Sequence, residues 1–159
     1  MIKKIVKTIL VLGLIALIVM QFIRPDKNSE GYESIAVFEV ETKPTQEVTQ
    51  LLKTHCYDCH SNQTRYPWYG EIAPFSYWLA DHIEHGKEEL NFSDWASYSV
   101  KRKDHKLDEV IEEVEEGHMP LDSYTWIHGT LTQEEKTTLI QWAGLARLRY
   151  QEEMQATGN

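Results

Sequence analysis

The two cysteines of the chain, Cys56 and Cys59, constrain its fold more than any other feature, because His60 follows them directly. Two thiols separated by two residues lie about one helical turn apart, so each can add to one of the two vinyl groups at one edge of a haem. The histidine that follows can bring its imidazole under the iron. The pattern therefore predicts one covalently bound haem c, attached at Cys56 and Cys59, with His60 as an axial ligand.

Three other interpretations fit the same pair of cysteines. A thioredoxin-like dithiol would need a buried strand before Cys56, and none is indicated there. A zinc site could combine the cysteines with His82 and His85, although two intervening residues are fewer than zinc sites usually place between histidines. A disulfide between Cys56 and Cys59 would close too small a loop to restrict the unfolded chain much. A thiol redox module and a zinc-binding module therefore remain as alternatives to haem.

The first 23 residues have the pattern of a membrane helix. Residues 5–23 are nearly all apolar, and Lys3, Lys4 and Lys7 lie around the start of this run. About nineteen helical residues at roughly 1.5 Å each would just cross the hydrocarbon core of a bilayer, whereas a buried core helix is usually shorter. No small-residue cleavage site of the signal-peptide type follows. We therefore expect residues 1–23 to stay on the protein as one N-terminal transmembrane anchor.

The distribution of charge predicts the side of the membrane on which the remaining chain lies. Lysines near the start of a span favour a cytoplasmic N-terminus. The rest of the chain would then lie on the periplasmic side of a bacterial inner membrane, where covalent haem proteins are assembled. The whole chain has 25 acidic and 16 basic residues, and all 25 acidic residues lie in this part. This excess of negative charge argues against nucleic acid as a partner. The expected partners are the membrane and redox proteins.

Beyond the anchor, the sequence predicts a tether, one helical domain and a short tail. We expect the tether to cover residues 24–43, the haem-binding domain residues 44–153 and the tail residues 154–159. No segment alternates between apolar and polar residues as a half-buried strand would, so the predicted fold class is mainly α. Helical patterns begin near Thr45, Pro74, Asp104 and Thr132.

Glycines, a capping pattern and a loop are expected to separate these helices. Gly86 and Gly117 are expected to end helices, because glycine readily takes the left-handed conformation found there. Thr132 and Glu135 have the spacing of a capping box. Residues 61–70 include a proline and a glycine and should form a loop that folds back over the haem.

Aromatic side chains are expected to build the core of the domain. All five tryptophans and all eight tyrosines lie after residue 23, and each can bury on the order of 150–250 Å². We expect a buried porphyrin to complete this core.

The second axial ligand of the iron has to come from elsewhere in the domain. Of the four methionines, Met1 is the initiator, Met20 lies in the predicted anchor and Met154 in the polar tail, which leaves Met119. Met119 stands at a predicted helix end, directly before a proline, where a rigid turn can hold a thioether away from the chain. An isolated methionine can also simply fill the core, and the position could stay open or take a histidine. The candidate histidines are His82, His85, His118 and His128.

The motif is accompanied by further residues spread over the chain after about Val40. They comprise Ser61, Thr64, Tyr66-Pro67-Trp68-Tyr69, the stretch from Pro74 to Gly86, Leu90-Asn91-Phe92-Ser93, Trp95, Met119-Pro120, Tyr124, His128 and Trp142. Together with Cys56, Cys59 and His60, they resemble the bacterial haem-binding-domain family of small, membrane-anchored, cytochrome c-like proteins.

The resemblance implies a cytochrome c-like helical domain and a set of ligands. Thioether bonds would form at Cys56 and Cys59, with His60 as the proximal ligand and Met119 as the distal one. Many members have two prolines after this methionine, whereas a leucine follows Pro120 here. The resemblance does not assign roles to Tyr124 and His128. We expect them either to contact the haem propionates or to hydrogen-bond residues that ligate the iron.

A haem with histidine and methionine ligands has no open position for a substrate and a raised potential, which suits an electron carrier. The sequence therefore predicts a membrane-anchored periplasmic electron carrier rather than an enzyme. One alternative is a haem-based sensor or peroxidase-like enzyme in which Met119 is absent from the iron or displaced. Another is a binding module whose haem is only structural. No Ser/His/Asp order, phosphate loop or paired-carboxylate pattern indicates hydrolytic chemistry.

Overall fold

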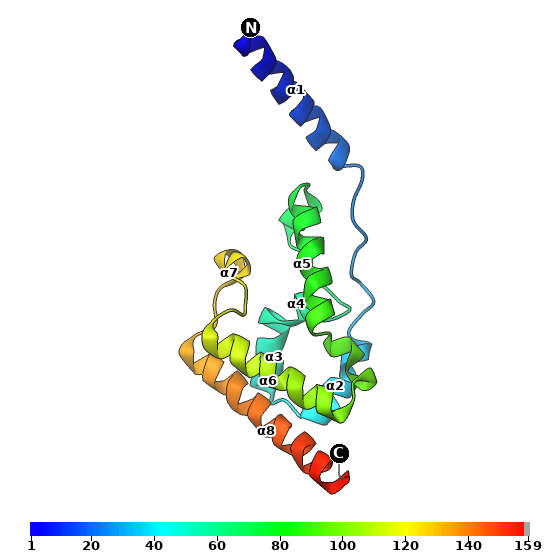
Figure 1. Ribbon diagram of the computed structural model, residues 1–159, viewed down its shortest axis with the longest axis vertical. Helices are drawn as coiled ribbons and strands as arrows, with labels where there is room; N and C mark the ends of the chain where they lie inside the picture. Colours follow the sequence, from blue (N-terminus) through cyan, green and yellow to red (C-terminus); the bar gives the residue numbers. More distant parts are fainter. Residues whose placement is uncertain (158–159) are drawn as a thin grey trace.

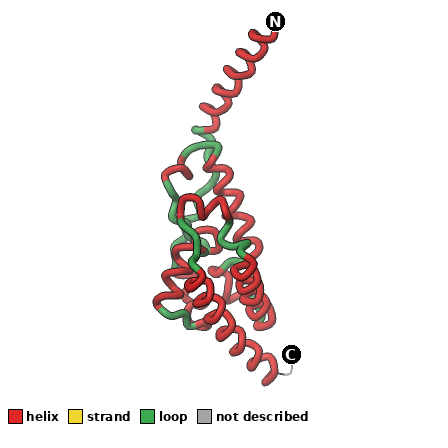
Figure 2. The backbone as a smooth tube through the Cα atoms, turned by 90° about the vertical axis from the view of Figure 1, so that its left-hand side faces the viewer, coloured by secondary structure: helices red, strands yellow, loops and turns green. Residues whose placement is uncertain are grey.

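A computed structural model describes residues 1–157, and every regular element in this part of the chain is a helix (Figure 2). The predicted mainly α fold class is therefore confirmed. The elements are α1 (Ile2–Met20), η1 (Glu33–Ile35), α2 (Ala36–Thr42), α3 (Gln46–His55), α4 (Tyr57–His60), η2 (Trp68–Glu71), α5 (Phe75–Glu89), η3 (Phe92–Ser97), α6 (Val100–Glu116), α7 (Asp122–His128) and α8 (Gln133–Thr157).

Helices α6 and α8 form an extensive antiparallel pair at one side of the domain (Figure 1). At the start of α8 the Glu135 carboxylate accepts a hydrogen bond from the Thr132 N–H (2.7 Å), and the Thr132 hydroxyl accepts one from the Glu135 N–H (3.2 Å), which confirms the predicted capping box. Helix α6 begins directly after Ser99, four residues earlier than expected, because the Ser99 hydroxyl accepts from the Arg102 N–H (3.3 Å). It ends as predicted at Gly117, whose φ is +81°.

An aromatic cluster occupies the centre of the core. The ring of Phe38 lies 4.5 Å from that of Phe92, 5.0 Å from Trp95 and 5.9 Å from Trp142, measured between centroids. The indole N–H of Trp95 donates to the hydroxyl of Tyr150 (3.0 Å), so the polar end of this buried ring is satisfied. The prediction that aromatic side chains build the core is therefore confirmed.

The predicted tether, residues 24–43, is wrong for its second half. Residues 33–42 form η1 and α2, and Ile35 and Phe38 are fully buried in the core. The indole N–H of Trp142 also donates to the backbone oxygen of Thr42 (3.2 Å), which ties α2 to α8. A helix of seven residues offers too few positions for its apolar face to be read from periodicity.

The predicted tail is also partly helical. Helix α8 continues through residues 154–157 to Thr157, so this part of the tail extends the last helix of the domain. Residues 158 and 159 lie outside the described part of the chain.

Helix α1 has the position of the predicted anchor and projects from the domain (Figure 1). None of its residues is buried. After its end, the side-chain amide of Gln21 donates to the Ala73 oxygen and accepts from the Ala73 N–H, each at 3.1 Å. Within residues 1–157, no helix is sufficiently long and apolar to cross a membrane, so the predicted transmembrane span is not supported.

Replacing Phe38 with alanine should lower the free energy of unfolding by about 3–5 kcal/mol, because a fully buried ring is lost from the centre of the core. Val40 lies in the same helix but is 72% exposed, so Val40→Ala should change it by less than about 0.5 kcal/mol. Urea denaturation measures both. Equal small effects would mean that residues 36–42 belong to a tether after all.

Candidate functional site

The cysteine motif forms one tight turn at the end of α3. Thr45 caps the start of this helix as predicted, its hydroxyl accepting from the Val48 N–H (3.2 Å). After the helix ends, the backbone oxygen of Cys56 accepts from the N–H groups of Cys59 (3.2 Å) and His60 (3.0 Å). The two thiols and the imidazole therefore leave the backbone within a single turn.

His60 is held in the protonation state that a metal requires. Its Nδ1 lies 2.9 Å from the backbone oxygen of Leu90. A carbonyl can only accept, so Nδ1 carries the proton and Nε2 keeps a free lone pair. Burial lowers the pKa of His60, which keeps the ring neutral at neutral pH. The arrangement is the one in which a backbone carbonyl orients a ligating histidine from behind.

Two neighbouring cavities meet at His60. One, of about 340 Å³, is lined by Cys59, and the other, of about 390 Å³, by Cys56. His60, Glu89 and Met119 line both. Each cavity falls in the range of small-molecule pockets, roughly 300–1,000 Å³. The structure therefore brings all four residues that the sequence predicted for the site, including the distant Met119, to one hollow region.

Met119 reaches this region from the end of α6. The helix stops at Gly117, and the Met119 N–H then donates back to the oxygen of Glu113 (3.0 Å). Of the alternative histidines, His82 and His85 also line the smaller cavity. His118 and His128 are not in its wall, and they instead lie beside acidic residues and beside Tyr69, respectively.

The two half-buried thiols do not suit a redox dithiol. Burial, with the nearby charges of Asp58 and of the other cysteine, raises the pKa of Cys56 to about 12. Burial and Asp58 raise the pKa of Cys59 to about 11. Reactive cysteines need the opposite shift, because the thiolate is the nucleophile. In the described residues, both cysteines are free, and no cluster of three or more His, Cys, Asp or Glu side chains is placed to hold a metal ion. The thiol redox and zinc alternatives thus gain no support.

Asp58, between the two cysteines, joins the motif to two other segments. Its carboxylate accepts from the backbone N–H of Arg65 (3.0 Å) and from the Arg65 guanidinium (2.9 and 3.1 Å). The hydroxyl of Tyr124 donates to the oxygen of Thr54 (2.7 Å) and also lies 3.3 Å from Asp58. Burial and the charge of Asp58 raise the pKa of Tyr124, so the hydroxyl stays protonated and can donate. Sequence reasoning missed Asp58 and Arg65, since a single acid inside the motif carried no spacing signal.

The sequence predicted that Gly86 would end its helix. This prediction is wrong, because α5 continues to Glu89. A Cβ at position 86 would lie 3.0 Å from the backbone oxygen of Cys59 and 3.2 Å from its Cβ. The glycine therefore permits α5 to approach the cysteine motif closely. Its role depends on a neighbour distant in sequence, which local helix-end rules cannot indicate.

The loop of residues 61–70 was expected to fold back over the haem, and the structure places it elsewhere. None of these residues lines either cavity. They pair instead with the segment that follows α1, where the Thr64 N–H donates to the oxygen of Asn28 (3.0 Å) and the Glu30 N–H to that of Asn62 (2.8 Å). Backbone pairing with a segment more than thirty residues earlier in the chain decided this position.

A partner is missing for one polar atom beside the cavity. The Nδ1 atom of His55, which lines the smaller cavity, is buried without a hydrogen-bond partner among the described residues. Burial lowers the pKa of His55, so the ring is neutral. Buried polar atoms are nearly always paired, so this unpaired nitrogen is an exception in the wall of the site. The two thiols, the neutral imidazole of His60 and the thioether of Met119 together fit an iron porphyrin.

A known protein family matches most of this chain. No curated protein and no solved structure matches the chain. Residues 15–144 match the sequence model of a family described as a haem-binding domain, and this match covers most of the chain. It includes the cysteine motif, both cavities and Met119. The protein therefore belongs to the haem-binding-domain family.

Proposed function

We propose that this protein is a membrane-attached electron carrier with one covalently bound haem c. The observation that carries the proposal is that Cys56, Cys59, His60 and Met119 line two adjoining cavities, with both cavities sharing His60 and Met119. When bound, haem iron exchanges single electrons between its ferric and ferrous states. The protein residues have to attach the group, fix its ligands and limit access to the iron.

Cys56 and Cys59 supply the attachment. Each thiol would add across one vinyl group of the haem, with the sulfur bonding to one vinyl carbon and the thiol proton passing to the other. Because the cysteines leave the chain within one turn and each lines a different cavity, one flat ring attached to both would extend across the two. Covalent bonds at two points fix the ring relative to His60.

His60 and Met119 supply the axial ligands. The Leu90 carbonyl keeps Nε2 of His60 free for the iron. Met119, in the wall of the same cavities, is the thioether that can occupy the opposite position. With both ligands in place the iron has no open position, which favours electron transfer over chemistry on a bound substrate.

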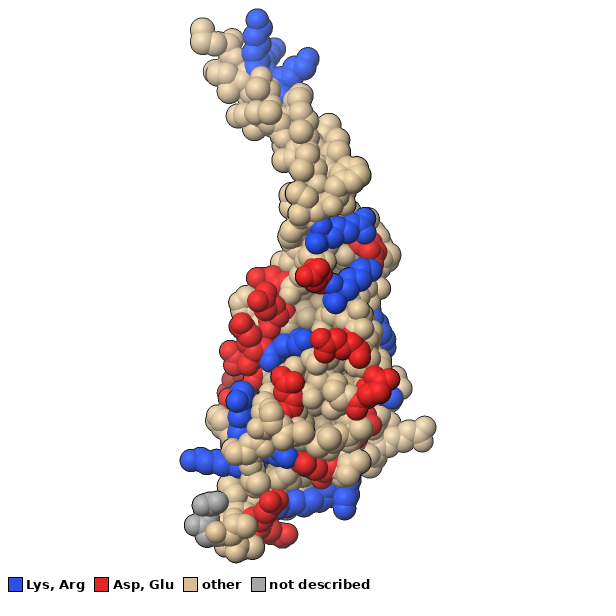
Figure 3. Space-filling view, turned by 90° about the vertical axis from the view of Figure 1, so that its right-hand side faces the viewer, with Lys and Arg blue, Asp and Glu red and all other residues tan. Residues whose placement is uncertain are grey.

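Helix α1 supplies the attachment to a bacterial inner membrane, with the haem domain on the periplasmic side. Support comes from its apolar side chains, none of which is buried by the other described residues. Its basic side chains gather at the end far from the domain (Figure 3). Lysine side chains at a helix end can extend to the headgroups while their stems stay in the apolar layer.

A haem-based sensor or peroxidase-like enzyme is the second candidate. The observation that favours it is that His55, whose Nδ1 has no hydrogen-bond partner among the described residues, is in the wall of the smaller cavity. A neutral imidazole next to an open iron position can accept or return a proton. This role would require Met119 to leave the iron.

Covalent attachment predicts that acidified acetone will fail to extract the haem, and that the haem will stay with the chain on a denaturing gel. The double variant Cys56→Ala with Cys59→Ala should lose all colour under both treatments. Met119→Ala is the control, because it keeps both thiols and should retain the haem on the gel. Colour that survives in the double variant would contradict the attachment.

Ligation by Met119 predicts that Met119→Leu abolishes the near-infrared sulfur-to-iron charge-transfer band of the ferric protein. Leucine keeps nearly the same volume, so a loss reports the sulfur rather than packing. The reduction potential of the haem should fall, by a fraction of the roughly 0.8 V range over which axial ligands set it. Carbon monoxide should bind the ferrous form of the variant. His82→Ala and His85→Ala should keep the band. A band unchanged in Met119→Leu would disprove the assignment.

Attachment through α1 predicts that the full chain sediments with membranes after a high-salt wash, whereas a chain beginning at Arg24 remains in the supernatant. Salt removes proteins held only by charge, so the wash isolates the apolar contribution. A phosphatase reporter fused after residue 159 should be active, because such reporters need the periplasm to fold. A full chain released by salt would exclude the apolar anchor, and an inactive reporter would exclude the topology.

A further inference from the structure

A groove separate from the two cavities at His60 lies between α7 and the corner formed by η2 and the start of α5. Its volume is about 520 Å³. Three of the five tryptophans, Trp68, Trp78 and Trp126, line it together with Phe75. Trp126 is 82% exposed and Trp68 76% exposed. No charged side chain is among the described residues that line it, and large exposed aromatic patches of this kind mark binding surfaces.

The groove lies at the end of the domain to which α1 is attached. The side-chain amide of Gln21 is hydrogen-bonded to both the N–H and the oxygen of Ala73, as described above. The hydroxyl of Tyr77 donates to the oxygen of Ile23, and Arg24 pairs with Glu71 (3.0 Å). These contacts hold the η2–α5 corner beside the end of α1 (Figure 1). If α1 attaches the protein to a bilayer, as proposed above, this corner lies beside the attached helix.

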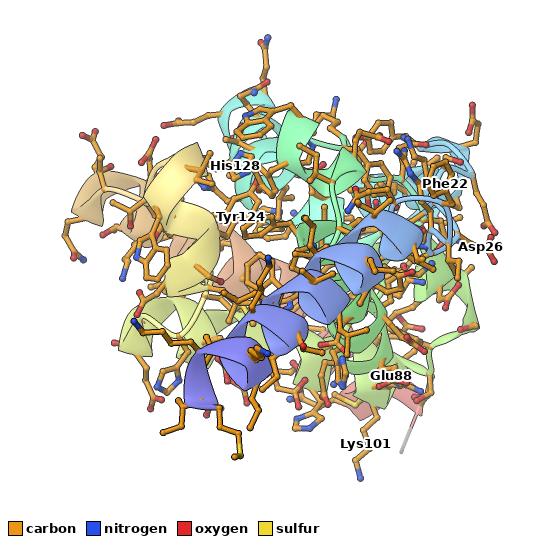
Figure 4. All side chains as sticks on the ribbon, turned by 90° about the horizontal axis from the view of Figure 1, so that it is seen from above. Phe22, Asp26, Glu88, Lys101, Tyr124 and His128 are labelled. Atoms are coloured by element: carbon orange, nitrogen blue, oxygen red, sulfur yellow. The ribbon has the colours of Figure 1, made fainter. Side chains whose placement is uncertain are left out.

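Three contacting rings link the groove to the smaller haem cavity, and these rings are called the shared wall below. The ring of Tyr69 lines the groove, and its hydroxyl is hydrogen-bonded to Nε2 of His128 (2.8 Å). His128 stacks on Tyr124, with ring centroids 4.2 Å apart and planes 15° from parallel. Figure 4 shows these two α7 side chains next to each other. Tyr124 in turn lines the smaller haem cavity.

We propose that this groove binds a lipid-soluble quinone, an inference that rests on the proposed electron-transfer function and on the proposed attachment of α1 to a membrane. A quinone ring is flat, uncharged and aromatic, so it can stack on the tryptophans, and its carbonyl oxygens can accept from a hydroxyl such as that of Ser123. A protein partner would usually be guided by complementary charge, which this lining lacks. A lipid chain or a second copy of the protein would cover the tryptophans without using the shared wall.

The redox balance sets the stoichiometry of the exchange. Oxidation of one hydroquinone to the quinone releases two electrons and two protons. One haem iron takes up one electron, so one hydroquinone reduces two ferric proteins and the two protons pass to solvent. The reverse reaction would use two ferrous proteins and two protons for each quinone.

Binding is tested without any redox reaction when both partners are oxidised. The full-length ferric protein in detergent micelles is titrated with a decyl-substituted benzoquinone, and the heat of binding is followed by calorimetry. Saturable binding is expected, weakened at least tenfold by Trp126→Ala and restored by Trp126→Phe, which returns an aromatic ring. Trp126 is largely exposed, so its loss should not affect folding. Leu145→Ala, 61% exposed on α8, is the matched control and should bind as the unmutated protein does.

Three results would overturn the proposal. Equal binding of decanol, which has the chain without the quinone ring, would assign the groove to lipid. Self-association that Trp126→Ala abolishes, without saturable quinone binding, would assign it to a second copy of the chain. Quinone binding that Trp126→Ala leaves unchanged would place the quinone elsewhere. The same samples are also checked for covalently attached haem that ascorbate reduces. If that haem is present and one of the three results above is obtained, the quinone site is disproved and the electron-carrier function is not.

Discussion

The hydrogen bond between Nδ1 of His60 and the backbone oxygen of Leu90 is the contact on which the site depends. It joins the cysteine turn to the segment between α5 and η3, and it selects the tautomer whose Nε2 is free. The close packing of Gly86 on Cys59 brings α5 to the same turn from its side. Two contacts between segments about thirty residues apart thus orient the predicted ligand and shape the cavity around it.

The aromatic core and the site are continuous. Phe92 packs on Phe38 and Tyr57 in the core, and it also lines the larger cavity together with Leu90. A bound ring would therefore rest against a core that α2, α3, α6 and α8 already build from their own side chains. This explains how a chain with so many charged residues can support a rigid site, because a few large rings bury much apolar area.

The charges around the site divide its surroundings into two kinds of surface. The larger cavity is bordered by Glu89, Glu109, Glu112 and Glu113. The aromatic groove on the other side of Tyr124 has a lining without charge among the described residues. Acidic and apolar surfaces select partners of different chemistry.

The sequence alone determined the parts that depend on local spacing. The spacing of Cys56, Cys59 and His60 predicted a haem-binding protein, and Thr45, Gly117 and the Thr132–Glu135 pair marked helix ends correctly. Local hydrogen bonds decide such features, so a short window of residues contains the information. The family match then supported a haem-binding domain over residues 15–144.

Tertiary structure decided everything that depends on contacts between distant segments. Phe38 belongs to the core only because Trp95 and Trp142 surround it, and Gly86 matters only because Cys59 lies against it. The groove likewise exists because α7 and α5 come together around Trp68 and Trp126. Periodicity reports which face of a helix is apolar, but the partner of that face is chosen by packing of the whole chain.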